Sequence, residues 1–183
     1  TFEQRYGLTA AAIAIYPMYK GLAQLVGMKK VEGPKTVAEE FAAAVTALKT
    51  HDYAFIHVKG TDMSGEDGNF DGKVKAIEEA DAALAQLLPE VDVLAITGDH
   101  STPVPVRGHS WHPQPVMITG EIAGWDGLDR FTERAANTLR ALTFVNDRFI
   151  RPTAVLVRKD KRQSQASRYL LELLQKQKSL EER

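Results

Sequence analysis

The chain of 183 residues contains no cysteine and no apolar run that approaches the roughly 20 residues of a membrane-spanning helix. The lack of cysteine excludes a finger-type zinc site and fits a reducing compartment, so we expect a cytoplasmic protein, with an organelle matrix as the alternative. The first residues, TFEQRYG, do not have the pattern of a signal peptide. The missing initiator methionine suggests that something upstream has been removed or is not part of this chain.

Neither sign of charge dominates, because 23 Lys and Arg oppose 24 Asp and Glu. This balance hides an asymmetry, since residues 148–183 carry ten basic side chains against four acidic ones and the rest of the chain is acidic. No aromatic platform accompanies the basic segment, which argues against nucleic-acid binding. Hydrophobic residues make up 44% of the sequence, which is enough for one domain with a substantial core.

Hydrophobic periodicity predicts an alternation of strands and helices. Strands are expected at Ala10–Ile15, Tyr53–Lys59, Asp92–Thr97 and Gln114–Thr119. Helices are expected at Pro17–Val26, after a capping box formed by Thr36 and Glu39, at Lys73–Leu88 before Pro89, and at Asp129–Leu142. This order predicts an α/β fold with a mostly parallel sheet and helices on its faces. In such sheets, ligands bind at the carboxyl ends of the strands.

Residues 98–112, GDHSTPVPVRGHSWH, are the most informative stretch of the chain. They follow a predicted strand, begin with the pair Asp99–His100, and contain three of the five histidines, His100, His109 and His112. A lone histidine is usually structural or merely exposed, but a cluster in a loop after a strand is typical of a binding site. Because carboxylate and neutral imidazole are ordinary ligands of zinc and manganese, the loop favours a divalent-metal site.

A second acidic segment, GTDMSGEDGNFDG, follows the predicted strand Tyr53–Lys59. Its spacing meets the first part of a calcium-binding EF-hand loop loosely, but the twelfth position is Lys73, which argues against calcium. The alternative is a solvated acidic turn before the next helix, with Asp71 near its N-terminus. That interpretation suits Asp67 and Asp71 better than Asp62, which lies just past the end of the strand.

Asp62 and the pair Asp99–His100 each lie just past the end of a predicted strand. Since the carboxyl ends of parallel strands share one edge of the sheet, two separate segments indicate one site. We therefore expect Asp62, Asp99, His100 and His109 to converge on a single pocket.

Three segments of the chain together resemble a known family. They are FEQRYGLTAAAIAIYPMYKGLAQLVGM, HVKGTDMSGEDGNFDGKVKAIEEAD and TGDHSTPVPVRGHSWHPQPV, and the resemblance runs from Thr1 to about Ala136. They are similar to the C-terminal half of cofactor-independent phosphoglycerate mutases of the archaeal type, in the alkaline phosphatase superfamily. The resemblance implies a three-layer, alkaline phosphatase-like fold that is incomplete in this chain.

The resemblance also implies a site for two divalent ions. Manganese is favoured, with zinc or magnesium as alternatives, and 2,3-bisphosphoglycerate is not required. By motif, Asp62 and His109 would hold one ion, and Asp99 and His100 the other. Many members have a histidine where this chain has Glu66, a harder ligand that favours manganese or magnesium over zinc. Arg107 and His112 are near enough in sequence to assist phosphate binding or to support the ligands.

The implied reaction interconverts 3- and 2-phosphoglycerate through a phospho-enzyme. The family places its hydroxyl nucleophile and a further metal-binding aspartate in an N-terminal segment that this chain lacks, together with a middle substrate domain. Ser64, Ser101 and Ser110 lie in the metal loops and not at the strand-to-helix turn of the family's nucleophile. The chain is thus interpreted as the metal-binding half of a mutase. The alternatives are an inactive structural or interaction subunit and a metal-dependent phosphohydrolase. We expect the lone chain to bind manganese weakly without mutase turnover.

The division into domains follows from where the resemblance ends. Residues 1–136 are expected to form a partial metal-binding domain, and residues 137–183 a basic tail that is partly helical. An apolar face in this tail consists of Tyr169, Leu170, Leu173 and Leu174. We expect the tail to pack outward or against a protein partner, without completing the active site and without binding nucleic acid or a membrane.

Overall fold

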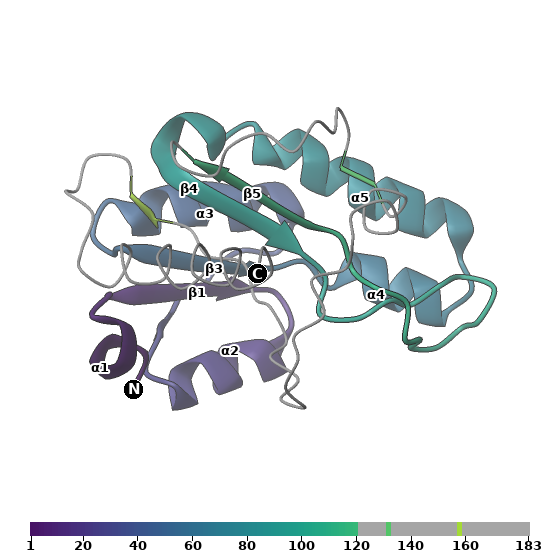
Figure 1. Cartoon of the computed structure of the whole chain (residues 1–183), viewed down its shortest axis with the longest axis horizontal. Helices are drawn as coiled ribbons and strands as arrows, with labels where there is room; N and C mark the ends of the chain where they lie inside the picture. The colour runs from purple at the N-terminus through teal and green to yellow at the C-terminus, as the bar shows by residue number, and fades with distance from the viewer. Residues whose placement is uncertain (121–130, 133–156, 159–183) are drawn as a thin grey trace, which may run out of the picture.

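The computed structural model describes residues 1–120, 131–132 and 157–158 (Figure 1). Its elements alternate between helices and strands, as expected for an α/β fold. The helices are α1 (Phe2–Tyr6), α2 (Pro17–Leu25), α3 (Val37–Leu48), α4 (Gly60–Glu66), α5 (Phe70–Leu84) and the 3₁₀ turn η1 (Leu88–Glu90). The strands are β1 (Ala10–Ala14), β2 (Lys29–Lys30), β3 (Tyr53–His57), β4 (Val91–Thr97), β5 (Val116–Gly120) and β6 (Val157–Arg158).

The described strands form one sheet in the order β2-β1-β3-β6-β4-β5. β1 pairs in parallel with β2 and β3, whereas β6 is antiparallel to both β3 and β4, so β3 and β4 run in the same direction. β5 is antiparallel to β4. The predicted α/β class with helices flanking a mostly parallel sheet is confirmed, with β5 and β6 as the two reversed strands.

The predicted strand at Ala10 is a buried strand of the core. All five residues of β1 are buried, which fits a strand covered on both faces. The crossovers from β1 to β2 and from β2 to β3 move in opposite directions across the sheet, so right-handed connections place α2 and α3 on opposite faces. Phe41 and Leu48 of α3 pack into the core cluster with Ile13 and with Leu87, which follows α5.

Two helix ends differ in how well the sequence predicted them. Thr36 and Glu39 form the predicted capping box, since the Glu39 N–H donates to Thr36 Oγ1 at 3.3 Å and Glu39 Oε2 accepts from the Thr36 N–H at 3.2 Å. The helix expected at Lys73–Leu88 instead begins at Phe70, after Asn69 as N-cap, and ends at Leu84. It ends early because the N–H groups of Gln86 and Leu87 bond three residues back, which tightens the last turn.

The glycine-rich segment after β3 is partly helical, because Gly60–Glu66, which includes Asp62, forms the short helix α4. Two glycines make this a poor helix former by propensity, and the packing of the segment decides its conformation. A Cβ atom at Gly65 would lie 2.3 Å from the Thr102 carbonyl oxygen, so a glycine allows α4 to approach the loop after β4. The expectation for Asp71 is confirmed, as it lies in the first turn of α5.

At residues 157 and 158, the structure departs from the expectation that the tail packs outward. Val157 and Arg158 form β6, which pairs with Tyr53 of β3 and with Val91 and Val93 of β4. The physical reason is that β3 and β4 have the space of one strand between them. The backbone N–H and C=O groups that face this space need hydrogen-bond partners, and β6 supplies some of them. β6 contacts the amino-terminal parts of β3 and β4 and so lies away from their carboxyl ends. Residues 121–130, 133–156 and 159–183, with most of the expected helix Asp129–Leu142, lie outside the described residues, and the two-domain division stays a prediction.

In the part of the chain that the structure describes, no helix is long and apolar enough to cross a membrane.

Glu40 is a buried carboxyl group in α3, with only 1% of its surface exposed. Its Oε1 accepts a hydrogen bond of 2.8 Å from the Ile15 N–H, the first backbone donor after β1. Burial raises the pKa of Glu40 from 4.5 to about 7, although this hydrogen bond opposes the shift. Glu40 therefore holds the end of β1. Ionisation of its buried carboxyl lowers the stability of the fold.

Glu40→Gln should raise the free energy of unfolding at pH 8 by up to about 3 kcal/mol, because the amide keeps an acceptor for Ile15 without a buried charge. In the wild type, the Glu40 carboxyl ionises near pH 4.5 in the unfolded chain and near pH 7 in the folded one. The free energy of unfolding therefore falls as pH rises from 4.5 to 7. Urea unfolding between pH 4.5 and 8 measures the difference. The exposed Glu90→Gln is the control, and a parallel pH profile for Glu40→Gln and wild type would contradict the prediction.

Candidate metal centre

The candidate site lies where β3 and β4 end, on the same edge of the sheet (Figure 1). The chain leaves β3 at His57 and enters α4, whose first turn carries Asp62. It leaves β4 at Thr97 and continues into the loop with Asp99, His100 and His109. The parallel course of β3 and β4 therefore brings these two segments together, as the sequence predicted.

Asp62 is the central carboxylate of the site and is only 15% exposed. Its Oδ2 pairs with Lys59 Nζ and its Oδ1 accepts a hydrogen bond from Thr102 Oγ1. Burial by itself would raise the pKa of Asp62, but the hydrogen bonds from Lys59 and Thr102 outweigh it and hold the pKa below its usual value. Asp62 is therefore ionised at neutral pH, which is the state that binds a cation.

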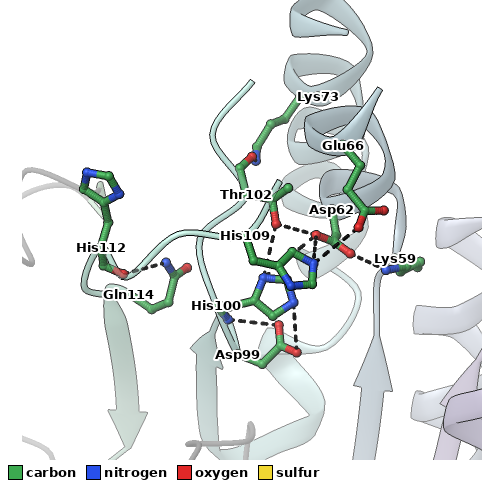
Figure 2. Close-up of polar contacts among 10 residues, drawn as sticks. All are labelled: Lys59, Asp62, Glu66, Lys73, Asp99, His100, Thr102, His109, His112 and Gln114. Atoms are coloured by element: carbon green, nitrogen blue, oxygen red, sulfur yellow. Dashed lines mark hydrogen bonds and ion pairs between the residues drawn. The ribbon is translucent and has the colours of Figure 1, made fainter. Parts of the chain in front are cut away.

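Two imidazoles face this carboxylate (Figure 2). His100 Nδ1 lies 3.9 Å and His109 Nε2 lies 3.7 Å from Asp62 Oδ1. The two rings lie against each other, with their centroids 3.8 Å apart. One potential ligand atom from each of these three residues lies within 4.8 Å of the other two, so all three side chains can contact one ion. The distance between Asp62 and His109 agrees with the predicted shared site.

Two further carboxylates extend the cluster in opposite directions. Glu66 Oε1 lies 3.3 Å from His109 Nε2, and Asp99 Oδ2 lies 3.5 Å from His100 Nε2. Figure 2 shows the imidazole rings between Asp62 and Glu66 of α4 and Asp99 of the β4 loop. Each imidazole thus has a carboxylate neighbour besides Asp62, and both of these carboxylates are more than 40% exposed.

The donor set fits a divalent transition metal. It combines an ionised carboxylate with two imidazoles, which are ligands of zinc and manganese, and it contains no thiolate. Three convergent ligands also leave coordination positions for water or substrate, as catalytic sites require. The Lys59 ammonium is paired to Asp62 and offsets part of the negative charge of the cluster.

The loop after β4 is held in place by backbone contacts. The Ser110 N–H donates to the Ser101 carbonyl at 2.8 Å, which closes the segment between them and brings His109 back toward His100. Lys73 of α5 donates to the Thr102 carbonyl at 2.6 Å, and Ser101 and Thr102 are both buried. The imidazoles are therefore positioned by a loop that α4 and α5 support.

The profile of the Metalloenzyme superfamily matches residues 1–142 of this sequence. The chain belongs to the Metalloenzyme superfamily. It is related to the 2,3-bisphosphoglycerate-independent phosphoglycerate mutases, which confirms the resemblance found from the motifs. The probable enzyme of this name from Aquifex aeolicus is 50% identical over 136 residues, which cover 73% of this chain and 33% of that protein. The probable enzyme of the same name from Thermosipho melanesiensis is 52% identical over 149 residues, which cover 80% of this chain and 37% of that protein.

A solved structure from Pyrococcus horikoshii, that of the PH0037 protein, has the same fold. It is 36% identical and superposes with a TM-score of 0.68, covering 74% of this chain and 39% of that one. The superfamily member described here thus spans about a third of the length of the curated relatives it matches.

Two predicted site residues lie apart from the cluster in this metalloenzyme domain. His112 is exposed, with its Nδ1 2.8 Å from Ser110 Oγ and its ring stacked on Trp111, and Figure 2 shows it away from Asp62. Arg107 is exposed and packs against Gly68, in the turn between α4 and α5. Their roles in phosphate binding or in support of the ligands stay predictions.

Sequence reasoning missed the polar side chains that hold the ligands of this metalloenzyme site. Lys59 and Thr102 contact Asp62, and Lys73 supports the loop through the Thr102 carbonyl. From the sequence, Lys73 indicates only that a calcium loop is absent. The available signal was position, because Lys59 lies two residues past the end of β3 and Thr102 lies three residues past Asp99, so both fall at the sheet edge that carries the candidate ligands.

A cavity of about 920 Å³ lies beside the site, near the carboxyl ends of β1 and β3. Its lining combines apolar and charged residues, among them Ile15, Val58, Met63, Lys35, Lys59, Glu40 and Glu79. Lys59 belongs both to this cavity and to the Asp62 contact, so the cavity and the candidate metal centre are neighbours.

Proposed function

We propose that this chain is the metal-binding part of a 2,3-bisphosphoglycerate-independent phosphoglycerate mutase. The observation that carries the proposal is the convergence of Asp62, His100 and His109, which come from two of the three segments that resemble the family. The identity of 50% or more to proteins with this name supports the same substrate class, 3- and 2-phosphoglycerate. Because the chain spans a third of those relatives, the complete reaction is assigned to the chain together with the remaining two thirds.

We assign two divalent ions to this edge of the sheet, with manganese favoured over zinc and magnesium. Asp62, Glu66 and His109 would hold one ion, while Asp99 and His100 would hold the other. This grouping follows the family motif and is supported by the distances of 3.3 Å between Glu66 and His109 and of 3.5 Å between Asp99 and His100. Asp62 Oδ1 lies within 3.9 Å of both imidazoles, so Asp62 would stand between the two ions, and with a single ion bound the same three side chains could share it. When bound, such ions activate a hydroxyl nucleophile and neutralise the charge that develops on the phosphate oxygens.

The residues of this chain would hold and orient these groups. Thr102 and Lys59 fix the two oxygens of Asp62, which leaves the carboxylate in one orientation for a cation. The adjacent cavity is lined by two lysines, Lys35 and Lys59, and by two glutamates, Glu40 and Glu79, so both signs of charge are available to orient a polar substrate. The phosphoryl group would pass from one glycerate oxygen to the nucleophile's hydroxyl and return to the other oxygen, with each displaced oxygen taking a proton.

The sheet also suggests where the remaining part of the protein would enter. β6 pairs with β3 only at Tyr53 and with β4 only at Val91 and Val93. In the described chain, the later residues of β3 and β4 therefore have an open position between them on the side of the site. A further strand at this position would end beside Asp62 and Asp99, and we infer that the nucleophile-bearing segment takes it.

Mixing this chain with the N-terminal two thirds of the Aquifex aeolicus relative should produce manganese-dependent conversion of 3- to 2-phosphoglycerate, followed in a coupled enolase assay. The chain alone should show none, because the hydroxyl nucleophile is assigned to the other part. His109→Ala in the mixture is the matched control and should lower turnover at least a hundredfold.

The other outcomes of this assay separate the alternatives. Turnover by the lone chain would contradict the assignment of the nucleophile to the other part. A folded, metal-loaded mixture without turnover would favour an inactive structural or interaction subunit. Release of inorganic phosphate from phosphoglycerate without isomerisation would favour a metal-dependent phosphohydrolase.

A further inference from the structure

Helix α5 exposes an apolar stripe on one face. Phe70, Val74 and Ile77 are 66%, 37% and 51% exposed, and their spacing of four and three residues puts them on the same side of the helix. The other side of α5 faces the protein, since Ala76 and Ala83 are buried. A contiguous apolar stripe of this kind marks a contact surface, unlike single exposed apolar residues.

The charges beside this stripe are acidic. Asp71, Glu78 and Asp81 are all exposed, and within the described residues no cation pairs with any of them. The ion pair between Lys75 and Glu79 on this helix lies on a different side, because Glu79 is about 180° around the helix from Phe70. The surface that covers the stripe should therefore be apolar at its centre and basic at its edges.

The C-terminal tail has this composition. Residues 159–178 contain six Lys and Arg against two acidic residues, and they enclose the apolar face at Tyr169, Leu170, Leu173 and Leu174. The helical spacing of that face predicts an amphipathic helix, which needs an apolar partner surface to be stable in water. Helix α2 also exposes apolar residues, Met18, Leu22 and Leu25, but it contains no acidic residue and carries Lys20, so it offers the basic tail no complementary charge.

The tail begins close enough to reach α5. Arg158 of β6 pairs with Val91, the first residue of β4, and only residues 85–90 separate α5 from that strand. The segment from Arg158 to Tyr169 can extend about 35 Å, whereas the 15 residues of α5 are about 22 Å long. The length of the tail thus permits its apolar face to lie over any part of the stripe.

We propose that residues 159–178 dock on α5, with the apolar face of the tail on the stripe Phe70–Val74–Ile77 and its basic residues beside Asp71, Glu78 and Asp81. This contact is intramolecular and lies outside the metal centre. It gives the basic tail a structural role on its own domain.

Cysteine cross-linking tests this contact sharply, because the wild-type chain contains no cysteine. In the full-length chain, Ile77→Cys combined with Leu173→Cys should give an intramolecular product with a short bis-maleimide reagent. The matched control combines Leu173→Cys with Leu22→Cys on the exposed face of α2 and should react at least tenfold more slowly. Both helix positions are about half exposed, so neither cysteine disturbs the core.

Charge reversal provides the second arm of the test. Glu78→Lys with Asp81→Lys in the Ile77/Leu173 cysteine pair should slow cross-linking roughly fivefold, and Arg168→Glu with Lys176→Glu should restore it. Glu79→Lys, on the opposite side of α5, should leave the rate unchanged. Equal cross-linking of the α2 and α5 pairs, products that join two chains, or reactive cysteines that form no intramolecular product would each overturn the proposal. None of these results depends on metal or on mutase activity.

Discussion

Asp62→Asn should lower the affinity of this chain for Mn²⁺ roughly a hundredfold or more. The substitution removes the charge of the least exposed carboxylate in the cluster and replaces one acceptor oxygen by a donor group. Lys59 would lose its ionic partner and leave an ammonium group beside residue 62, which further disfavours a cation. Isothermal titration with MnCl₂ at pH 7 measures the loss directly.

Asp67→Asn is the matched control for this experiment. Asp67 lies at the end of α4 and is not part of the Asp62, His100 and His109 cluster. Its substitution by asparagine changes the net charge by the same amount as Asp62→Asn. Its substitution should change the Mn²⁺ affinity by less than about threefold, as expected for a screened charge outside the site. Equal losses in the two variants would show that net charge, and not ligation by Asp62, determines binding.

Gly65→Ala should both destabilise the domain and weaken metal binding at least tenfold. The new Cβ would lie 2.3 Å from the Thr102 carbonyl oxygen and 2.9 Å from Thr102 Cγ2, so α4 and the β4 loop must separate. Thr102 bonds to Asp62 through its hydroxyl and to Lys73 through its carbonyl, and the displacement therefore disturbs the support of the ligands. Overpacking of this kind costs about 1–3 kcal/mol, which urea unfolding measures beside the Mn²⁺ titration.

Gly21→Ala gives the control for an added methyl group in a helix. Gly21 lies inside α2, and a Cβ there would meet no atom within 4 Å. Its substitution should leave metal binding unchanged and raise the free energy of unfolding by up to about 1 kcal/mol, because alanine favours the helix. A Gly65→Ala variant that behaved like Gly21→Ala would show that α4 and the loop can separate without affecting the site.

The convergence of the candidate ligands Asp62, His100 and His109 could be predicted because its signal is local. Asp62 follows one buried strand and Asp99–His100 follows another, and parallel strands bring their carboxyl ends to one edge. His109 was included because of its residue type and its glycine- and proline-containing loop, and the Ser101–Ser110 backbone contact places it against His100. The capping box at Thr36 is equally local and was also predicted.

The elements that were missed depend on contacts between distant segments. α4 contains two glycines and forms where Gly65 meets Thr102, a residue 37 positions later in the chain. The insertion of Val157–Arg158 between β3 and β4 joins residues that are about 60 to 100 positions apart. Neither the periodicity of a segment nor its propensity contains such a contact, because both describe a chain segment in isolation.

The sequence by itself determined the α/β alternation and the residue types of the candidate metal site, since hydrophobic period and ligand chemistry are properties of short segments. Only the tertiary structure decided which groups hold those ligands. Lys59 and Thr102 reach Asp62 because α4 packs on the β4 loop, and Glu66 lies beside His109 because α4 turns it toward that ring. These contacts depend on distances of a few ångströms between separate elements, and such distances are fixed by packing in three dimensions.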